Sequence, residues 1–406
     1  MVRAGLVVVG ASLAGLRAVE AARLAGHRGP VTLVGAEPHL PYDRPPLSKE
    51  FLGLPGGAVP TFHNAVALTR ELGADLRLGS PATALDVDEQ TIEVAGSTIR
   101  YDALVLATGA AARTLPGTTH LSGVHTLRGL DDARAIRAAL LPGTRVVVVG
   151  AGFIGAEVAY AARRRGLAVT VVEAAAAPMV RAVGDRFGAV LGEVLRRDGI
   201  DLRCGAGVDM FEGDGRVRAV RLTDGGVLPA DLVVLGVGAA PATGWLATSG
   251  LKLDDGVVCD ENLHAGAPGV YAAGDVVRWF NPVFGQTMRL ENWTTAAEQA
   301  VVAARNAVDP AAARPCATVP YFWSDWNGRR VQFVGVPEAD ETVLVDGDPG
   351  GDTFLAVYRR EDRLVGALGL GQRRAVMALR AAIARGTRWA PALRGLRAQP
   401  GGAGPG

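Results

Sequence analysis

Arg145-Val-Val-Val-Val-Gly-Ala-Gly-Phe-Ile-Gly155 reads as a short buried strand that runs directly into a glycine-rich turn. The residues over 156–165 predict a helix, and those over 168–173 predict a second strand. Both strands are apolar almost throughout, which is typical of parallel strands buried on both faces of a sheet. The stretch therefore predicts a βαβ unit with its glycine turn between the first strand and the helix.

An earlier part of the chain repeats this unit. Gly5-Leu-Val-Val-Val-Gly-Ala-Ser-Leu-Ala-Gly15 predicts a strand and a small-residue turn, with a helix over 16–25 and a strand over 31–35. In each unit a later strand also ends in glycine and small residues, over 101–109 in the first and 231–238 in the second. The sequence therefore predicts two Rossmann-like domains of the same type.

The two glycine turns point to nucleotide binding. A glycine-rich turn between a strand and a helix lets the backbone approach a pyrophosphate, and the helix N-terminus supplies free N–H groups and partial positive charge. The first turn departs from the usual pattern because Ser12 stands where the middle glycine is expected, although a serine is still small. Two such turns in one chain indicate two dinucleotides, one serving as a two-electron hydride donor and the other as a flavin.

An acidic residue stands at the expected place in the second unit. Glu173 ends the second strand 23 residues after Gly150, where a carboxylate accepts hydrogen bonds from an adenosine ribose. The following residues, Ala174-Ala-Ala-Ala177, include no arginine or lysine to receive a 2′-phosphate. This pattern favours NADH over NADPH. In the first unit Glu37 is the candidate ribose ligand, two residues beyond the strand.

The last quarter of the chain has a different pattern of predicted elements. Short strands are predicted over 331–335, 342–346, 353–358 and 363–369, with turn residues between them, and a helix is predicted over 372–385. This arrangement is typical of an antiparallel sheet. The glycine- and proline-rich tail over 398–406 is predicted to be disordered. The fold class is therefore α/β, with two Rossmann-like domains and a C-terminal α+β domain.

Composition limits the function. The chain has 406 residues, of which 49% are hydrophobic and 20% charged, and its net charge of +1 gives no reason to expect nucleic acid. No apolar run approaches the roughly 20 residues that cross a bilayer. Met1-Val2-Arg3 leads straight into a strand without a signal peptide. We therefore expect a cytoplasmic protein without a membrane segment.

The cysteines and histidines argue against two kinds of chemistry. Cys204, Cys259 and Cys316 are far apart and form no Cys-x-x-Cys pair, so neither a redox dithiol nor a zinc site is expected. The six histidines are scattered without ligand spacing, so no metal is assigned.

The run Glu37-Pro-His-Leu-Pro-Tyr-Asp-Arg-Pro-Pro-Leu-Ser-Lys-Glu50 closely resembles a segment of the NADH-dependent ferredoxin reductases of the putidaredoxin-reductase type. These flavoproteins serve bacterial cytochrome P450 and ring-hydroxylating dioxygenase systems. The resemblance covers nearly the whole chain. It includes the segments 107–109, 150–157, 273–275, 291–293 and 321–325.

The resemblance implies a division into domains. An FAD domain would comprise residues 1–114 and 242–317, with an NADH domain over 115–241 inserted into it. A C-terminal domain would cover 318–397. The partner would be a small iron–sulfur ferredoxin that receives electrons one at a time. The oligomeric state stays open between a monomer and a weak dimer.

The resemblance also implies site residues. Those at FAD are Gly10, Ser12, Leu13, Ala14, Gly15, Glu37, Arg44, Pro45, Lys49, Ala82, Thr108, Gly109, Arg128, Gly274, Asp275 and Trp293. Those at NADH are Gly150, Gly152, Phe153, Ile154, Gly155, Glu157, Glu173 and Gly238. Lys49 and Glu157 are the catalytic candidates: the lysine would lie beside the isoalloxazine and the glutamate would pair with it.

Several of these residues also have ordinary structural readings. Lys49 stands out because only it and Lys252 are lysines among 42 basic residues, yet most lysines are surface groups. Glu157 would normally be a solvated helix residue. Asp275 would bond the ribitol or a flavin-chain hydroxyl, and as Gly-Asp before an apolar run it also suits a helix N-cap. Trp323 is expected in the core.

The C-terminal end is rich in arginine. Ten arginines stand between Arg359 and Arg397, against only Glu361 and Asp362. Most such charges form a solvated face, but a basic patch would also steer an acidic ferredoxin.

Other functions stay open at this stage. A rubredoxin reductase, a stand-alone NADH oxidase and a redox-responsive signalling flavoprotein all fit the two glycine turns. A disulfide or peroxide reductase fits poorly, because that chemistry needs a cysteine near the flavin and the first 203 residues contain none.

Overall fold

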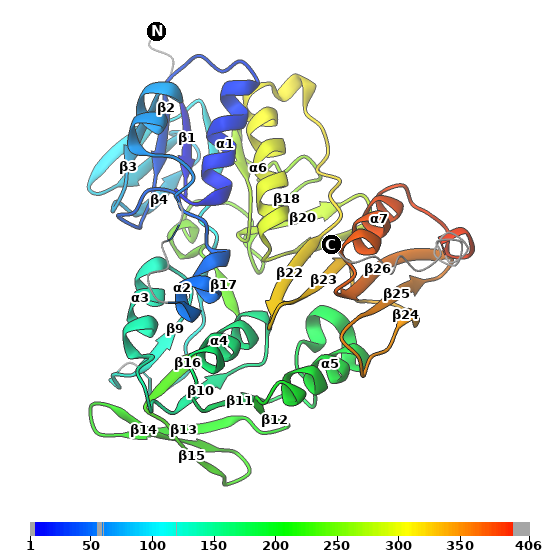
Figure 1. Ribbon diagram of the computed structural model, residues 1–406. Coiled ribbons are helices and arrows are strands. Elements are labelled where there is room, and N and C mark those ends of the chain that lie inside the picture. Colours follow the sequence, from blue (N-terminus) through cyan, green and yellow to red (C-terminus); the bar gives the residue numbers. More distant parts are fainter. Residues whose placement is uncertain (1–4, 55–58, 60, 119, 393–406) are drawn as a thin grey trace. The chain divides into compact units, whose positions relative to one another are not determined.

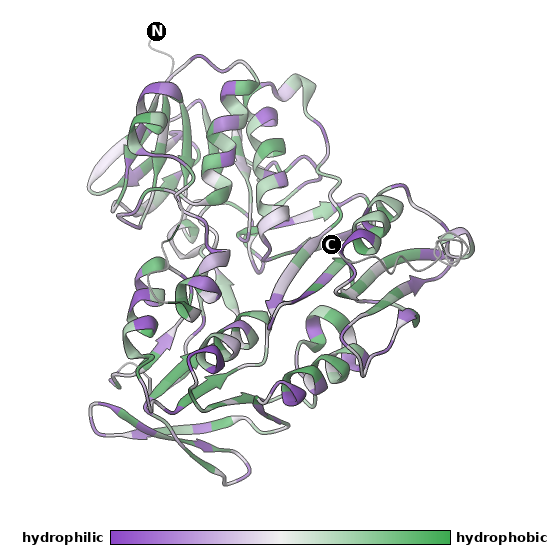
Figure 2. Cartoon of the chain, viewed as in Figure 1, coloured by the Kyte–Doolittle hydropathy of each residue, from purple (hydrophilic) through white to green (hydrophobic). Residues whose placement is uncertain are grey.

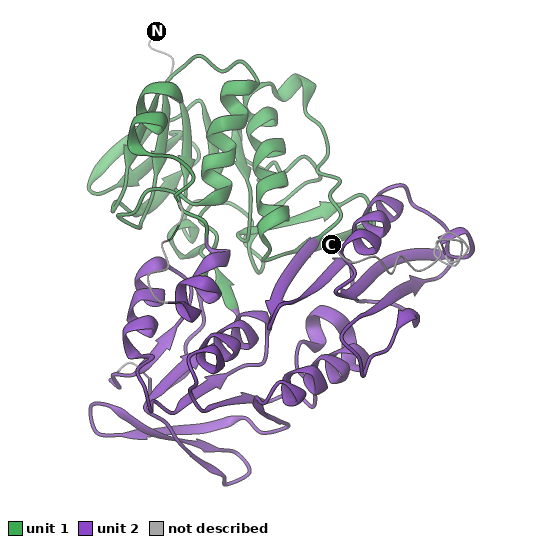
Figure 3. Cartoon of the chain, in the orientation of Figure 1, with its two compact units in different colours: residues 1–43, 59–111, 239–320 green, residues 44–58, 112–238, 321–406 purple. Residues whose placement is uncertain are grey.

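The computed structural model describes residues 5–54, 59, 61–118 and 120–392. The chain divides into two compact units, coloured separately in Figure 3. Unit 1 comprises residues 1–43, 59–111 and 239–320, and unit 2 comprises residues 44–58, 112–238 and 321–406. The tail over 398–406, predicted to be disordered, lies outside the described residues.

Unit 1 is built on a five-stranded parallel sheet in the order β19-β7-β1-β2-β3. Its strands are β1 (Leu6–Val9), β2 (Val31–Val34), β3 (Ala74–Arg77), β7 (Ala103–Leu106) and β19 (Val270–Ala272). Helices α1 (Leu13–Leu24) and α6 (Trp293–Val308) pack on each other (Figure 1). Strand β1 pairs with β2 and with β7, so the first glycine turn emerges at the centre of the sheet.

Smaller elements complete unit 1. Two three-stranded sheets have the orders β4-β5-β6 and β18-β20-β21. Their strands are β4 (Ala82–Asp86), β5 (Thr91–Val94), β6 (Ser97–Arg100), β18 (Val257–Cys259), β20 (Val277–Asn281) and β21 (Gln286–Arg289). Short strands β8 (Ala110–Ala112) and β17 (Ala239–Pro241) pair where the chain passes from one unit to the other and back.

Unit 2 repeats the parallel sheet in the order β12-β11-β10-β16-β9. Its strands are β9 (Val124–Thr126), β10 (Val146–Val149), β11 (Val169–Glu173), β12 (Asp201–Cys204) and β16 (Leu232–Leu235). Its helices are α2 (Glu50–Gly53), α3 (Leu130–Ala139), α4 (Phe153–Arg164) and α5 (Val180–Arg197), the last kinked at Gly184. A three-stranded ribbon follows, made of β13 (Val208–Gly213), β14 (Val217–Leu222) and β15 (Val227–Pro229).

The C-terminal part of unit 2 is an antiparallel sheet in the order β22-β23-β26-β25-β24. Its strands are β22 (Tyr321–Trp326), β23 (Arg329–Gly335), β24 (Glu341–Gly347), β25 (Phe354–Arg360) and β26 (Arg363–Leu370), and α7 (Arg373–Ala384) packs against β26 and β23. The predicted antiparallel sheet and helix are both present. Strand β22 is an addition to the predicted strands.

The cores of both parallel sheets follow from their sequences. All four residues of β1 and of β10 are buried, and Figure 2 shows both strands in the hydrophobic colour. A strand covered on both faces gains free energy from burying every side chain, so its sequence is apolar without alternation. The predicted pair of Rossmann-like folds is therefore confirmed.

Both nucleotide-type helices begin earlier than predicted. Helix α1 starts at Leu13 rather than residue 16, and α4 starts at Phe153 rather than residue 156. The glycine turn supplies the first helical turn itself, so the small and apolar residues after Ser12 and Gly152 already have helical backbone. This matters for the sites, because the first N–H groups of a helix have no partner within it.

Candidate functional site

The glycine turn of unit 2 connects β10 to α4. Gly150 has a φ of +98°, and a Cβ there would lie 2.4 Å from the carbonyl oxygen of Gly236. A Cβ at Gly155 would lie 2.1 Å from the carbonyl oxygen of Gly150. Gly152, by contrast, faces open space, with nothing within 4 Å of an added Cβ. Two glycines thus close the turn tightly, while the third leaves room in front of it for a ligand.

Glu173 stands beside this turn at the end of β11. Its Oε2 accepts a hydrogen bond from the backbone N–H of Ala151 at 2.8 Å, and its Oε1 accepts one from Ala175 at 2.9 Å. Each carboxylate oxygen keeps a further lone pair for a hydroxyl group. Glu173 therefore both fixes the turn and presents an acceptor where a ribose is expected.

The remaining NADH candidates surround the same turn. Phe153 and Ile154 form the first turn of α4, and the Ile154 side chain is 46% exposed despite being apolar. Gly238 follows β16, and a Cβ there would lie 3.7 Å from a terminal nitrogen of Arg181. Arg181 is thus a cation beside Gly238 to which the sequence motifs assign no role.

The glycine turn of unit 1 has the same construction. Gly10 has a φ of +121°, and a Cβ there would lie 2.0 Å from the carbonyl oxygen of Ala107. A Cβ at Gly15 would lie 1.8 Å from the carbonyl oxygen of Gly10. Gly274 lies close by, since a Cβ there would come within 3.3 Å of the Ala14 Cβ. The structure thus brings the predicted residues of 10–15, 108–109 and 274 together in unit 1.

Unit 1 also has buried polar atoms that fit a polar cofactor. Gln299 on α6 accepts a hydrogen bond from the Gly274 backbone N–H at 2.9 Å, and both Gln299 and Thr295 are 1% exposed. Gln299 Nε2 and Thr295 Oγ1 have no hydrogen-bond partner among the described residues. Buried polar groups are rarely left unpaired. Together with the tightly closed turn of residues 10–15 at the start of α1, they fit a bound dinucleotide such as FAD.

Three other FAD candidates lie in unit 1, and the side chains of two of them form hydrogen bonds there. Glu37 Oε2 accepts a hydrogen bond from the Tyr42 hydroxyl at 2.6 Å. The indole N–H of Trp293 donates to Asp43 Oδ1 at 2.9 Å. Ala82 opens strand β4. These contacts hold the side chains in place, while their roles at a cofactor stay predictions.

The structure corrects two expectations for single residues. Asp275 caps no helix, because it lies in a turn that leads into strand β20. Trp323 is half-buried and stacks on Tyr321 at 5.7 Å between ring centroids, whereas Trp326 is fully buried. Strand β22 alternates its faces, so Ser324 and Trp326 point one way and Trp323 the other.

The two catalytic candidates meet in unit 2. Lys49 Nζ lies 2.7 Å from Glu157 Oε1, with side chains that are only 12% and 2% exposed. Lys49 sits between a 3-10 turn that begins with Pro45-Pro46 and the short helix α2, whereas Glu157 is on α4. Proline fixes φ for such a turn. A buried ion pair is thus formed by residues from two separate segments of the chain.

Two serines complete the surroundings of Glu157. Ser48 donates a short hydrogen bond to Oε2, and Ser324 donates to Oε1 at 2.6 Å. Both serines are buried. The sequence reading assigned neither of them a role, although both stand inside motifs that it quoted. Ser48 is adjacent to Lys49 and Ser324 to Trp323 in the sequence, but adjacency to a motif residue does not by itself assign a serine a role.

Arg44 and Arg128, predicted at FAD, are also linked within unit 2. A terminal nitrogen of Arg44 donates to the backbone carbonyl of Arg128 at 2.7 Å. This bond joins the Tyr-Asp-Arg-Pro-Pro motif to the segment that enters α3.

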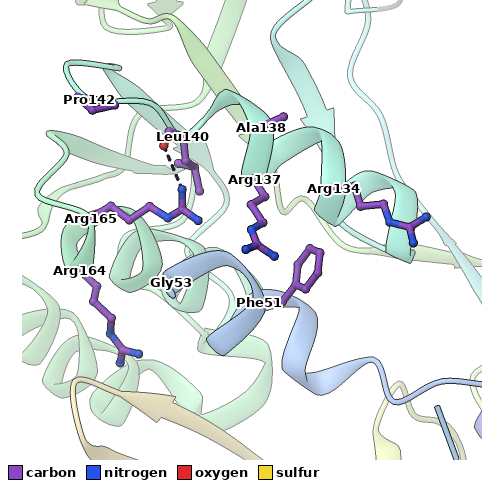
Figure 4. Close-up of a pocket in the computed structure, with 9 residues that line it drawn as sticks. All are labelled: Phe51, Gly53, Arg134, Arg137, Ala138, Leu140, Pro142, Arg164 and Arg165. Carbon is purple, nitrogen blue, oxygen red and sulfur yellow. Dashed lines mark hydrogen bonds between the residues drawn. The ribbon is translucent and has the colours of Figure 1, made fainter. Parts of the chain in front are cut away.

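A cavity of about 860 Å³ lies in unit 2, and none of the predicted site residues lines it (Figure 4). It is lined by Phe51, Gly53, Arg134, Arg137, Ala138, Leu140, Pro142, Arg164 and Arg165. The Arg137 guanidinium lies over the Phe51 ring at 4.8 Å. Arg165 donates to the backbone carbonyls of Leu52 at 2.6 Å and Leu140 at 3.1 Å. Burial, and secondarily the charge of Arg137, lowers the pKa of Arg165.

These bonds make Arg165 a link between α2, α3 and α4. We expect Arg165→Ala to lower the free energy of unfolding by about 2 kcal/mol, because hydrogen bonds to a charged group are lost and buried carbonyls stay unpaired. Arg164→Ala, at an exposed neighbouring position, should change it by less than about 0.5 kcal/mol. Urea unfolding of the two variants measures the difference, and equal stabilities would show that Arg165 is no link.

The described residues offer neither a membrane-spanning helix nor a metal-binding cluster. No helix among them is long and apolar enough to cross a bilayer. In the same part of the chain, no three His, Cys, Asp or Glu side chains gather as a metal site requires.

Comparisons with known proteins agree with this architecture. The family described as pyridine nucleotide-disulphide oxidoreductase matches residues 4–300, and the reductase C-terminal domain matches residues 321–395. The chain belongs to the pyridine nucleotide-disulphide oxidoreductase family. The fold and the two glycine turns define the same class, so the predicted fold class is confirmed.

Particular relatives narrow the class. The chain is 38% identical to the ferredoxin reductase component of chlorobenzene dioxygenase from Cupriavidus sp. (strain PS12), over 88% of this chain and 87% of that one. It is 36% identical to the ferredoxin--NAD(+) reductase component of the biphenyl dioxygenase system from Paraburkholderia xenovorans (strain LB400), over 89% and 88%. The resemblance to ferredoxin reductases is therefore confirmed.

A solved structure matches the fold of nearly the whole chain. The crystal structure of the covalent putidaredoxin reductase–putidaredoxin complex superimposes with a TM-score of 0.90 at 30% identity, covering 95% of this chain and 94% of that one. The likeness extends over the C-terminal sheet as well as both parallel sheets.

Proposed function

We propose that the protein is an NADH-dependent ferredoxin reductase: it oxidises NADH with bound FAD and passes the electrons singly to a small iron–sulfur ferredoxin. The ferredoxin in turn serves a cytochrome P450 or a ring-hydroxylating oxygenase. The predicted function, cofactors and partner agree with the reductase relatives. The observation that carries the proposal is the buried pair of Lys49 and Glu157, which belongs to the same unit as the turn at Gly152.

The cofactor supplies the change from two electrons to one. When bound, it would supply a centre that takes up a hydride's two electrons together and gives them up singly. The chain's part is to bind and orient. Residues 10–15 and 274, with Thr295 and Gln299, would hold the FAD chain, because they combine a tight turn before a helix with buried unpaired polar atoms. The turn at 150–155 would hold the NADH pyrophosphate.

Glu173 supports NADH as the nucleotide. Its carboxylate is held by two backbone N–H groups beside the turn, at 2.8 and 2.9 Å. A carboxylate fixed there accepts hydrogen bonds from ribose hydroxyls and repels a 2′-phosphate.

Lys49 and Glu157 are proposed to act in the hydride-transfer step. Because water is largely excluded from both side chains, the charges interact more strongly than they would at the surface. Such fixed charges stabilise charge that develops in a transition state without reorganising. The carboxylate holds the lysine ammonium group in one orientation.

The cysteines argue against thiol chemistry. Burial, with a smaller contribution from Glu298, raises the pKa of Cys316 to about 12, and burial also raises the pKa values of Cys259 and Cys204. The thiolate is the reactive form, so none of the three is activated as a nucleophile at neutral pH.

Thiol titration checks this directly. With Ellman's reagent at pH 7, we expect the native protein to react only slowly, and through the half-buried Cys204 alone. All three thiols should react in denaturant. A fast-reacting thiol in the native protein would bring the disulfide-reductase alternative back.

The arginine-rich end is proposed as the ferredoxin-docking surface. Arg373 and Arg374 open α7 and are exposed, as is Arg385 just after it. Arg359 and Arg388 pair with Glu341 and Asp362 instead. Two further arginines of this region, Arg394 and Arg397, lie outside the described residues.

Salt and substitution test this surface. Raising the ionic strength to about 1 M, where the Debye length is about 3 Å, should slow ferredoxin reduction severalfold. The reduction of the flavin by NADH should change little. Arg373→Ser/Arg374→Ser should raise the KM for ferredoxin, whereas Arg218→Ser, at an exposed position on β14, should leave it unchanged. Salt-independent turnover would rule out docking by charge.

The whole activity is tested by cytochrome c reduction with the FAD-loaded protein and NADH. We expect the rate to depend on added ferredoxin, with putidaredoxin and a dioxygenase ferredoxin as the first probes. Rapid reduction without ferredoxin would favour an NADH oxidase. Turnover with rubredoxin alone would favour a rubredoxin reductase.

We further propose that the protein acts in the cytoplasm, where NADH is generated. Cell fractionation tests this location.

We also propose that the FAD, NADH and C-terminal domains have the boundaries expected from the sequence. Limited proteolysis tests these boundaries.

A further inference from the structure

A chain of hydrogen bonds runs from the C-terminal sheet to Glu157. The indole N–H of Trp326 donates to Ser324 Oγ at 2.8 Å, and Ser324 Oγ donates to Glu157 Oε1 at 2.6 Å. Lys49 Nζ lies 2.7 Å from the same Oε1. Ser324 and Trp326 are both 0% exposed. The carboxylate oxygen that faces the lysine is therefore also held by a buried serine from another part of the chain.

The direction of this chain is fixed by the chemistry of its members. An indole nitrogen is only a donor, so Ser324 Oγ must accept the bond from Trp326. A serine hydroxyl has a single proton, and a carboxylate is only an acceptor. The Ser324 proton therefore points at Glu157. Trp326 thus determines the orientation of the hydroxyl, and the hydroxyl determines that of Oε1.

The hairpin that carries Ser324 is firmly attached to α4. The Phe322 and Phe153 rings lie 4.5 Å apart, and the Trp326 and Tyr160 rings lie 5.9 Å apart. At the start of the next strand, Arg329 forms an ion pair with Asp198, which also accepts a hydrogen bond from the Tyr160 hydroxyl at 2.6 Å. Ser324 is thus held rigidly with respect to Glu157.

We propose that Ser324 is a positioning residue for the reductase reaction: with Trp326 behind it, it holds Glu157 Oε1 in the one orientation that pairs with Lys49. This inference rests on the proposed function and adds a role for the C-terminal sheet in flavin reduction. Ser48, which bonds the other carboxylate oxygen, fixes the second half of the carboxylate.

The test is a double-mutant cycle on flavin reduction by NADH, followed by anaerobic stopped flow with the FAD-loaded protein. Ser324→Ala should lower the limiting rate about tenfold, because a hydrogen bond to a charged group is lost. The apparent Kd for NADH should stay nearly unchanged. In a Glu157→Gln background the same substitution should cost less than about twofold, because its target is already altered. Ser249→Ala, at a buried serine bonded to a backbone carbonyl, should have no effect.

Two results would overturn the proposal: an unchanged rate in Ser324→Ala, or equal losses with and without Glu157. If Ser324→Ala folds poorly because the Trp326 N–H is left unpaired, Ser324→Ala/Trp326→Phe removes both partners and should show the same loss and the same coupling. Failure of the proposed function is distinguishable, since the wild-type flavin would then not be reduced by NADH at all.

Discussion

Glu157→Gln should lower the rate of flavin reduction by NADH by roughly 100-fold, an effect of the size seen when a fixed electrostatic partner of a transition state is removed. The substitution keeps the shape of the side chain but removes the charge that faces Lys49 at 2.7 Å. Lys49 would then be a largely buried cation without its counterion. Anaerobic stopped flow at saturating NADH measures the effect on the step itself.

Glu193→Gln is the matched control for this prediction. Glu193 is an exposed carboxylate on α5 that pairs with Arg196, so its loss should leave flavin reduction unchanged. The thermal unfolding midpoint and the FAD content of both variants should be measured alongside the rates. If Glu157→Gln stays within about twofold of the wild-type rate, the ion pair is structural and takes no part in hydride transfer.

Glu173→Gln should weaken the preference for NADH over NADPH by about ten- to a hundredfold in the ratio of kcat/KM. The amide loses the negative charge that repels a 2′-phosphate, and its charge-assisted bonds to ribose hydroxyls become ordinary ones. It also keeps only one oxygen for the backbone N–H groups of Ala151 and Ala175. Steady-state reduction of ferricyanide with each nucleotide provides the ratio.

The ratio separates two roles of Glu173. If NADH and NADPH efficiencies fall together, the carboxylate only supports the glycine turn. If kcat/KM for NADH falls while kcat/KM for NADPH stays the same or rises, Glu173 binds the ribose hydroxyls of NADH directly. Glu212→Gln, on strand β13 and paired with Arg221, should change neither value.

The sequence predicts the two parallel units well because their signals are local. A fully apolar strand, a glycine turn and a helix follow one another within about 30 residues, and each element is recognisable without knowledge of its neighbours. The antiparallel sheet is predicted for the same reason. The prediction is wrong mainly at the ends of elements. Helices α1 and α4, for example, begin inside their glycine turns rather than after them.

The surroundings of Glu157 are not predictable in this way. Ser48 and Glu157 are 109 residues apart, and Ser324 is 167 residues from Glu157. Only the folded chain brings them to one carboxylate. The resemblance to ferredoxin reductases implied the pairing of Lys49 with Glu157, but composition and spacing contain no trace of the serines' part in it.

The prediction for Trp323 was wrong because residues 321–326 were not predicted to form a strand. Tyr321-Phe-Trp-Ser-Asp-Trp326 contains two tryptophans, and the sequence reading placed the first of them in the core. Once the segment is a strand, alternation assigns Ser324 and Trp326 to the buried face. Because Trp326 shares that face with Ser324 and Trp323 does not, Trp326 is the one of the two that orients Ser324.

The central claim is that electrons enter as a hydride from NADH and leave singly to ferredoxin. The most direct test is anaerobic: reduce the FAD-loaded protein with one equivalent of NADH, mix it with excess oxidised ferredoxin, and count the ferredoxin reduced per FAD. The account predicts about two ferredoxin molecules per FAD, in a reaction much faster than reoxidation of the same reduced protein by oxygen. A reduced protein that leaves ferredoxin oxidised, and loses its electrons only when oxygen is admitted, would contradict it.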